Sequence, residues 1–300
     1  ESSAASDVYK RQNLKSLTRY HKEDEQQLFN AKTYHQLSLW QSVKQEAPLN
    51  VIVPVYRNLK VTQQCLERVI QSKQNRPYKI TVINDYSPEA DIHTYLDELA
   101  NEGKIKLITH AENEGFVRSV NNGMTSDTQS DVVLLNSDAY VTDYWLDYLR
   151  EAVYKEERIA TGTPFSNNAT IFSYPINCQE TEDVPKDLTL EELAKICRQV
   201  NQDMTIEVPS GHGFCMYIRR DALREVGYFD AETWGKGYGE EVDWCQRALD
   251  LGWRHIAATG VFIQHVGSQS FVGDKINLIN RSLKLISEKY PEYDLSLIHI

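Results

Sequence analysis

The sequence has few cysteines and no excess of positive charge, and both shortages exclude whole classes of protein. Its five cysteines are scattered without a C-x-x-C pair, so neither a zinc knuckle nor a disulfide framework is indicated and a reducing compartment is expected. Its 32 Lys and Arg residues against 43 Asp and Glu residues give a net charge of −11, which disfavours general nucleic-acid binding. A nucleotide diphosphate can still be held through a divalent metal that carboxylates recruit.

Long hydrophobic runs are also missing. No apolar segment approaches the roughly 20 residues that a membrane-spanning helix needs, and the N-terminus has no signal-peptide hydrophobic region. We therefore expect a soluble, cytoplasmic chain without a transmembrane segment, in which the glycosylation sequons at Asn168 and Asn280 carry no weight. Walker A, H-E-x-x-H and G-x-S-x-G motifs are absent as well. The 300 residues, 41% hydrophobic and 25% charged, are otherwise ordinary for a globular protein.

The two ends of the sequence look foreign. SDVYKRQ near the start and SLIHI at the finish resemble translated adapter sequence, so we expect roughly the first 12 residues and residues 295–300 to be non-native. The polar, helix-prone stretch that follows predicts an N-terminal helical arm over residues 1–47.

Short β-branched runs then alternate with helical patterns. The predicted strands are residues 49–56, 78–85, 104–110 and 131–138, with helices over 61–72 and 116–124 between them. This alternation predicts a parallel α/β sheet. A helix at 142–155 leads into a loop-rich stretch and a helix at 189–200 that looks like an insertion. The remaining expected elements are strands at 207–220 and 254–266 and helices at 221–227, 240–251 and 274–290.

Polar residues follow each of the four early strands. They are Tyr56 after the first, Asn84 and Asp85 at the second, Asn113 to Gly115 after the third, and Asn136 to Asp138 at the fourth. The carboxyl ends of strands in open α/β sheets form the ligand crevice. A single Asp at such a place is more often a helix cap or turn former, but four coordinated cases indicate a binding site. Asp138, at the mouth of this crevice, is the main candidate for holding a hard cation.

A second acidic cluster opens the predicted helix at 240–251. Glu240, Glu241 and Asp243 lie in its first turn, where the helix dipole alone favours acids, and Asp243 is spaced to form an ordinary surface pair with the arginine four residues on. The preceding glycine-rich GKGYG loop is flanked by aromatic residues, and mobile loops with aromatics often cover sugars. We therefore predict a catalytic carboxylate in this cluster.

Seven motifs in series resemble glycosyltransferase family 2, the inverting GT-A enzymes. They are VIVPVYRN, VINDYSP, NEGFVRSVNNGM, LLNSDAYV, GFCMYIRRDALREVGYFD, YGEEVDWCQRALDLGW and FIQHVGSQSF, and they cover roughly residues 48–272. The inserted and final helices resemble the branch of bacterial polysaccharide and O-antigen assembly. The resemblance implies a GT-A fold, with a Rossmann-like, mostly parallel sheet flanked by helices. It divides residues 48–290 into a nucleotide-sugar half (48–140), an acceptor and catalytic half (141–272) and a C-terminal helix (273–290).

The resemblance also implies roles for single residues. The nucleotide sugar would lie against Pro54, Val55, Tyr56, Asn84, Asp85, Asn113, Gly115, Arg118, Asn136, Ser137 and Asp138. The acceptor would lie against Gly211, His212, Trp234 and Tyr238. Asp138 and His265 would hold Mn²⁺ or Mg²⁺, although a lone histidine at a strand end is more often a core residue. The sequence departs from the family pattern at Asn136, which replaces the first D-x-D aspartate, and at Glu241, which replaces the usual catalytic Asp and leaves open whether Glu240 or Glu241 is the base.

The implied function is metal-dependent, inverting transfer of a hexosyl or deoxyhexosyl group. The donor would be a nucleotide-diphosphate sugar and the acceptor a hydroxyl of a glycan or lipid-linked glycan, in cell-surface polysaccharide synthesis at the inner face of the plasma membrane. A sugar-nucleotide pyrophosphorylase would need a Gly-rich basic loop where this sequence has YRNLK. A catalytically inactive GT-A-like nucleotide- or glycan-binding module within a larger protein is the other alternative, and donor turnover distinguishes it from an enzyme.

Overall fold

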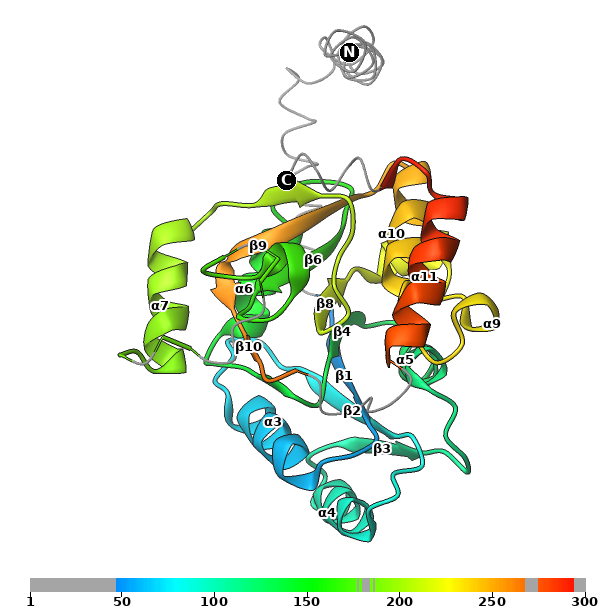
Figure 1. The fold of residues 1–300 in the computed structure, drawn as a ribbon. Helices are drawn as coiled ribbons and strands as arrows, with labels where there is room; N and C mark the ends of the chain where they lie inside the picture. The colour runs from blue at the N-terminus through cyan, green and yellow to red at the C-terminus, as the bar shows by residue number, and fades with distance from the viewer. Residues whose placement is uncertain (1–46, 177, 180–183, 186, 268–274, 294–300) are drawn as a thin grey trace, which may run out of the picture. The chain divides into compact units, whose positions relative to one another are not determined.

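The computed structural model describes residues 47–176, 178–179, 184–185, 187–267 and 275–293 (Figure 1). All of them belong to one compact unit, Ala47–Ile300. The predicted N-terminal arm, apart from residue 47, and the C-terminal residues 295–300 lie outside the described residues.

A central sheet of eight strands organises the described part of the chain, in the order β3-β2-β1-β4-β8-β6-β9-β7. The strands are β1 Leu49–Val55, β2 Lys79–Asn84, β3 Lys106–Thr109, β4 Asp131–Leu135, β6 Ile159–Phe165, β7 Ile206–Val208, β8 Cys215–Ile218 and β9 Arg254–Phe262. Strands β1 to β4 run parallel to one another, as do β6 and β9. Strand β8 is antiparallel to both of its neighbours, and β7 is antiparallel to β9. The predicted α/β sheet is confirmed.

Helices cover both faces of this sheet (Figure 1). They are α3 Leu59–Gln71, α4 Ala90–Asn101, α5 Phe116–Thr125, α6 Trp145–Val153, α7 Leu190–Asn201, α8 Arg220–Val226, α9 Ala231–Trp234, α10 Glu240–Asp250 and α11 Lys275–Lys289, with a short 3-10 turn at Thr170–Phe172. Alternate residues of β1 serve opposite faces: Val51 and Val53 pack in a cluster with α3, α4 and α6, whereas Ile52 packs with α5 and α10.

The predicted insertion helix is α7. It begins with a capping box, because the Thr189 hydroxyl accepts from the Glu192 N–H at 3.2 Å and the Glu192 carboxylate accepts from the Thr189 N–H at 2.8 Å. Leu190 and Leu193 on its inner face pack against Phe262 of β9. The insertion is therefore attached to the edge of the sheet that lies farthest from β3.

The structure differs from the predicted elements in several places. Strand β6 lies in a stretch that was predicted to be a loop. The sequence does not show this strand because its buried positions hold Thr161, Thr163 and a glycine instead of large apolar residues. The predicted strand 207–220 is divided into β7 and β8 by a glycine-containing loop, and 254–266 is divided into β9 and β10 (Gln264–His265). Helix α4 is absent from the prediction although its apolar residues have helical spacing.

The chain reverses its direction across the sheet between β1 and β4. Strands β2 and β3 continue on one side of β1 and β4 lies on the other, so the carboxyl ends of β1 and β4 border the switch point where α/β proteins bind ligands. A two-stranded ribbon of β5 (Ala139–Tyr140) and β10 lies at this edge. Within the described ranges, none of the helices has both the length and the apolar character needed to cross a membrane.

Candidate active site

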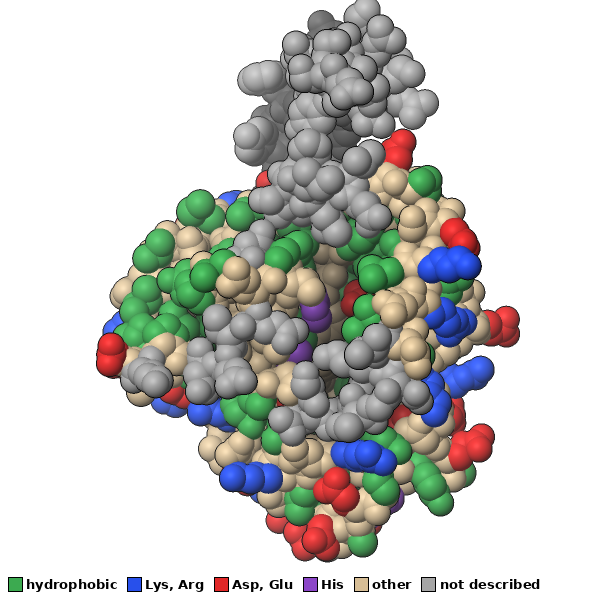
Figure 2. Space-filling view, in the orientation of Figure 1, with side chains coloured by type: hydrophobic (Ala, Val, Ile, Leu, Met, Phe, Trp, Pro, Cys, Tyr) green, Lys and Arg blue, Asp and Glu red, His purple; other side chains and the backbone are tan. Residues whose placement is uncertain are grey.

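The ribbon of β5 and β10 brings together two residues that are far apart in the sequence. Ala139 pairs with His265, so the preceding Asp138 lies beside the imidazole, with Oδ1 3.2 Å from His265 Nε2. The two residues are 6% and 9% exposed. Asn136 Nδ2 lies 3.5 Å from the same Nε2. Figure 2 shows histidine side chains at the bottom of a hollow in the face of the molecule.

The imidazole of His265 is fixed from three sides. Its Nδ1 lies 2.7 Å from the Asn168 carbonyl oxygen, which can only accept, so Nδ1 carries the proton. The Asn167 amide accepts from the His265 N–H at 2.8 Å and donates to the His265 C=O at 3.0 Å. The Phe214 ring stacks on the imidazole with centroids 5.1 Å apart. These contacts direct Nε2 toward Asp138.

The Asp138–His265 pair fits a divalent cation. A neutral His265 protonated on Nδ1 presents a lone pair to the Asp138 carboxylate, and two lone-pair groups 3.2 Å apart repel unless a proton or cation lies between them. Imidazole nitrogen and carboxylate oxygen are both common metal ligands. No group of three or more His, Cys, Asp or Glu residues among those described is arranged to hold a metal.

The carboxylate of Asp85, at the end of β2, is fully used inside the protein. Its Oδ1 accepts from His110 Nδ1 at 2.9 Å and from the Glu114 N–H at 2.8 Å. Its Oδ2 accepts from Asn113 Nδ2 at 3.0 Å and from the Gly115 N–H at 2.9 Å. A carboxylate has about four lone-pair sites. Asp85 therefore holds this loop at the start of α5, and a nucleobase could bond to its carboxylate only by displacing one of these donors.

The other residues predicted for the nucleotide lie at the same edge of the sheet. Asn84 is buried, and its Oδ1 accepts from the Ser87 N–H at 3.0 Å. Val55 is 1% exposed, and its carbonyl accepts from the Asp85 N–H at 2.8 Å. The predicted residues with at least partly exposed side chains are Pro54, Tyr56, Asn113, Arg118 and Asn136.

Glu240 and Glu241 form a desolvated pair at the start of α10. Glu240 is 4% exposed, and the Oε2 atoms of both have no hydrogen-bond partner in the part of the chain that the structure describes. Burial raises the pKa of Glu240 well above its ordinary value, and the charge of Glu241 raises it further. Burial also raises the pKa of Glu241, against the opposing effect of backbone N–H groups that include those of Gly239 and Gly213. Such carboxylates are suited to accept a proton near neutral pH.

Two glycines bring the loop before α10 against the loop that Asp85 holds. A Cβ atom on Gly115 would lie 2.9 Å from Lys236 Cα, and the Phe116 N–H donates to the Lys236 carbonyl at 3.4 Å. Gly239 has a φ of 100°, and a Cβ atom there would lie 2.5 Å from the Trp234 ring. The predicted nucleotide side and the acid pair are thereby joined.

The loop between β7 and β8 connects the acid pair to His265. A Cβ atom on Gly213 would lie 3.9 Å from Glu241 Oε1, and the next residue is the Phe214 that stacks on His265. Burial is the main cause that lowers the pKa of His212 to about 3, so its ring is neutral. His212 Nδ1 accepts from the Phe214 N–H at 3.2 Å, which leaves Nε2 as a donor.

Two sequence predictions on this side of the site are wrong. Trp234 is 1% exposed and packs in the core cluster of α5 and α10, where it contacts Gly239. Its ring therefore cannot stack on an acceptor sugar. Tyr238 remains partly exposed. Asp243 forms the predicted pair with Arg247, but its side chain is fully buried, so the pair is not an ordinary surface pair. Its carboxylate accepts from Arg247 Nε at 2.9 Å, from the Tyr290 hydroxyl at 2.7 Å and from Lys289, which ties α10 to α11.

The sequence reading missed four residues that shape the site. They are His110, Asn167, Asn168 and Phe214. His110 ends a predicted strand, and its position at the carboxyl end of that strand could have identified it as a site residue. The two asparagines lie in a segment predicted as loop, and a sequence pattern gives no indication that their amide and carbonyl groups meet His265, almost 100 residues later.

The switch-point sheet with its ribbon and its acid pair defines the molecule as a GT-A fold. A family model, "Glycosyl transferase family 2", matches residues 50–227, which is more than half of the chain. The chain belongs to glycosyl transferase family 2.

Two curated animal proteins match part of the chain. It is 26% identical over 121 residues to N-acetylgalactosaminyltransferase 7 of Drosophila melanogaster. It is 23% identical over 124 residues to the human probable polypeptide N-acetylgalactosaminyltransferase 8. Each match covers 39% of this chain and 20% of the relative, so the matched region is about a fifth of the relatives' length.

Two solved structures share the fold. GalNAc-T7 with UDP, GalNAc and Mn²⁺ superposes with a TM-score of 0.61 at 16% identity, over 82% of this chain and 49% of that one. The mannosyltransferase PcManGT from Pyrobaculum calidifontis, in complex with GDP-Man and Mn²⁺, gives 0.52 at 14% identity, over 80% of this chain and 67% of that one. Both neighbours were solved with a nucleotide and Mn²⁺.

Proposed function

We propose that this chain is a metal-dependent glycosyltransferase that moves a sugar from a nucleotide-diphosphate donor to a hydroxyl of a glycan or lipid-linked glycan. The observation that carries the proposal is the buried Asp138–His265 pair, 3.2 Å apart at the switch point of the sheet. The family membership and the two neighbours with bound nucleotide and Mn²⁺ support it.

The metal-binding residues act by holding the donor diphosphate in place. A bound Mn²⁺ or Mg²⁺ supplies neutralisation of the charge that develops on the leaving diphosphate. Asp138 Oδ1 and His265 Nε2 would be its protein ligands, and the Asn168 carbonyl keeps the His265 proton on Nδ1, so Nε2 would present its lone pair to the metal. The donor would lie along the carboxyl ends of β1, β2 and β4.

Glu241 is the proposed general base. Glu240 is the more deeply buried of the two acids, and burial together with the charge of Glu241 raises its pKa well above the ordinary value, so we assign the proton to Glu240 and the carboxylate to Glu241. Glu241 takes the proton of the acceptor hydroxyl as that oxygen bonds to the anomeric carbon, and the bond from this carbon to the diphosphate breaks. A single displacement from the opposite face inverts the anomeric centre.

The acceptor would enter between Tyr238 and the loop of Gly211 and His212. The neutral His212 presents its Nε2 proton as a hydrogen-bond donor to the acceptor sugar. The loop before α10, which packs against the start of α5, limits the access of water that would hydrolyse the nucleotide sugar. Transfer of a hexosyl or deoxyhexosyl group in cell-surface polysaccharide synthesis, at the cytoplasmic face of a bacterial membrane, remains a proposal that rests on the motif resemblance. Both curated relatives described above are animal proteins.

The second candidate is a catalytically inactive nucleotide- or glycan-binding module. Asn136 in place of an acidic residue favours it, since the described chain then offers two charged or imidazole metal ligands instead of three. Hydrolysis or transfer of UDP-, GDP- and dTDP-sugars with and without Mn²⁺ distinguishes the candidates. We expect Mn²⁺-dependent release of one nucleoside diphosphate that Asp138→Ala abolishes. Binding of a nucleotide without any release would establish the inactive module.

A further inference from the structure

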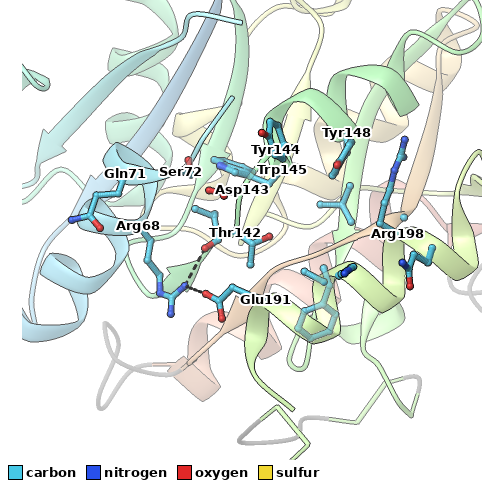
Figure 3. A pocket seen from close by; sticks show the side chains of 17 residues that line it. Arg68, Gln71, Ser72, Thr142, Asp143, Tyr144, Trp145, Tyr148, Glu191 and Arg198 are labelled. Atoms are coloured by element: carbon cyan, nitrogen blue, oxygen red, sulfur yellow. Dashed lines mark hydrogen bonds and ion pairs between the residues drawn. The ribbon is translucent and has the colours of Figure 1, made fainter. Parts of the chain in front are cut away.

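A cavity separate from the candidate active site lies between α3, α6, α7 and β9 (Figure 3). Its volume is ≈ 470 Å³, within the range of roughly 300 to 1,000 Å³ that small-molecule sites have. None of its lining residues belongs to the candidate active site. The ribbon connects the two places, because Thr142 just after β5 and Phe262 just before β10 line the cavity.

Aromatic rings and planar polar groups line the cavity together. Tyr144 and Tyr148, one helical turn apart, have ring centroids 6.2 Å from each other, and the Arg198 guanidinium stacks 4.2 Å from the Tyr148 centroid. Gln71 and Gln199 add amides from two different helices. A pyranose ring has apolar C–H faces and a rim of hydroxyls, so rings and planar donors and acceptors are complementary to it.

The charges around the cavity are largely paired. Arg68 of α3 meets Glu191 of α7 at 2.9 Å, as Figure 3 shows, and Arg198 meets Glu151 at 2.7 Å. Lys195 is exposed on α7. An anionic ligand would have to compete with the carboxylates for the arginines, whereas a neutral ligand can bond to both partners of an existing pair. The pairing therefore favours a neutral ligand.

The backbone at Tyr144 adds an independent observation. Its φ is 63°, a left-handed conformation that is uncommon for an aromatic residue. The Tyr144 N–H donates to the Lys73 carbonyl at 2.7 Å, and its own carbonyl accepts from the Tyr148 N–H at 3.0 Å. Strained residues held in this way are concentrated at functional sites. Here the conformation places the Tyr144 ring on the cavity wall.

We propose that this cavity binds neutral hexose or N-acetylhexosamine units of a glycan and so anchors the acceptor beside the transfer site. That the bound glycan is the acceptor rests on the proposed function, whereas glycan binding itself does not. Thr142 follows Asp138 by four positions, which at about 3.3 Å per residue limits the path between the two places to about 13 Å. A short oligosaccharide spans such a distance.

Saturation-transfer NMR on the full chain without nucleotide tests the proposal. The probes are the methyl glycosides of glucose, galactose, mannose, N-acetylglucosamine and N-acetylgalactosamine at millimolar concentration. We expect at least one to bind and its affinity to fall about 2- to 12-fold in Tyr144→Gly and in Tyr148→Ala, because each removes one stacking ring. Tyr144→Gly suits the positive φ, so this variant keeps the backbone.

Tyr86→Gly is the matched control. Tyr86 also has a positive φ, 57°, and is 54% exposed, but it lies at the carboxyl end of β2 and does not line the cavity. Binding should be unchanged in this variant and in the presence of UDP or GDP with Mn²⁺. The proposal is overturned if the wild-type protein binds none of the glycosides, or if all three variants lose the same affinity. It is also overturned if a nucleotide displaces the bound glycoside, or if methyl glucuronide, an anionic comparison, binds more tightly than the neutral glycosides. Glycoside binding without any nucleotide binding would instead overturn the proposed function alone.

Discussion

Asn167 offers the sharpest test of how the protein orients His265, the proposed metal ligand. The change to alanine removes an amide that is 2% exposed and that pairs with both the N–H and the C=O of His265, at 2.8 and 3.0 Å. Two such hydrogen bonds contribute about 1 to 3 kcal/mol to the free energy of unfolding. Because the change also frees the His265 backbone, we expect the affinity for Mn²⁺ to fall about 10- to 100-fold, as is usual when a residue that orients a ligand is lost.

The chain contains a matched control for this change. The Asn121 amide makes the same reciprocal pair with Phe229, accepting from its N–H at 3.1 Å and donating to its C=O at 2.8 Å, in the part of the core formed by α5 and α10. Asn121→Ala should therefore lose similar stability in denaturant unfolding and keep its Mn²⁺ affinity, measured by electron paramagnetic resonance with UDP or GDP present. Equal Mn²⁺ affinities in Asn167→Ala and the wild type, or equal losses in both variants, would refute the reasoning.

Three further predictions concern the carboxylates. Glu241→Gln should reduce the rate of transfer about 10²- to 10⁴-fold and spare nucleotide binding. Glu240→Gln, which mimics a protonated side chain, should keep most of the rate. Steady-state kinetics with both variants would show the reverse order if Glu240 is the base. The raised pKa of Glu240 means that its folded form binds a proton more readily than its unfolded form, so this residue lowers stability as the pH rises. Glu240→Gln should accordingly be more stable than the wild type at neutral pH, and a difference that fails to shrink toward pH ~4.3 in denaturant unfolding would contradict this account. Asp85→Ala leaves His110 Nδ1 and the N–H groups of Glu114 and Gly115 without their carboxylate acceptor and should lower the free energy of unfolding by roughly 3 to 5 kcal/mol. A loss below 1 kcal/mol would contradict the structural role of Asp85.

The sequence predicts the sheet well wherever a strand is a continuous apolar run. Strands β1, β2 and β4 have such runs, and their boundaries agree with the structure within a few residues. Strand β6 does not, because Thr161, Gly162 and Thr163 fill its buried positions, and threonine and glycine are also frequent in loops. Residue composition therefore does not predict β6, where small residues pack against Val153 and the loop of His212.

The motif pattern predicts which residues gather at the site better than it predicts what each side chain does there. Asp138 and His265 meet as expected from the resemblance, although 127 residues separate them. Asp85 was predicted to line the nucleotide site, but its carboxylate accepts from several internal donors. Trp234 was predicted to line the acceptor site, but it is enclosed in the core. A sequence shows that a polar or aromatic residue is near a loop, whereas exposure depends on contacts with distant segments. Trp234 shows this, because it is buried in a core cluster that includes residues of α5, more than 100 positions earlier in the chain.

The central claim is that Asp138 and His265 hold a metal-bound nucleotide, and thermal stability tests it most directly. The wild type, Asp138→Ala and His265→Ala would each be unfolded with UDP, GDP, dTDP and CDP, with and without Mn²⁺. A ligand at 100 times its dissociation constant adds about 2.7 kcal/mol. We predict a stabilisation by one nucleotide that requires Mn²⁺ and disappears in both variants. Stabilisation that is independent of Mn²⁺ or survives in both variants, or no stabilisation by any nucleotide, would contradict the account.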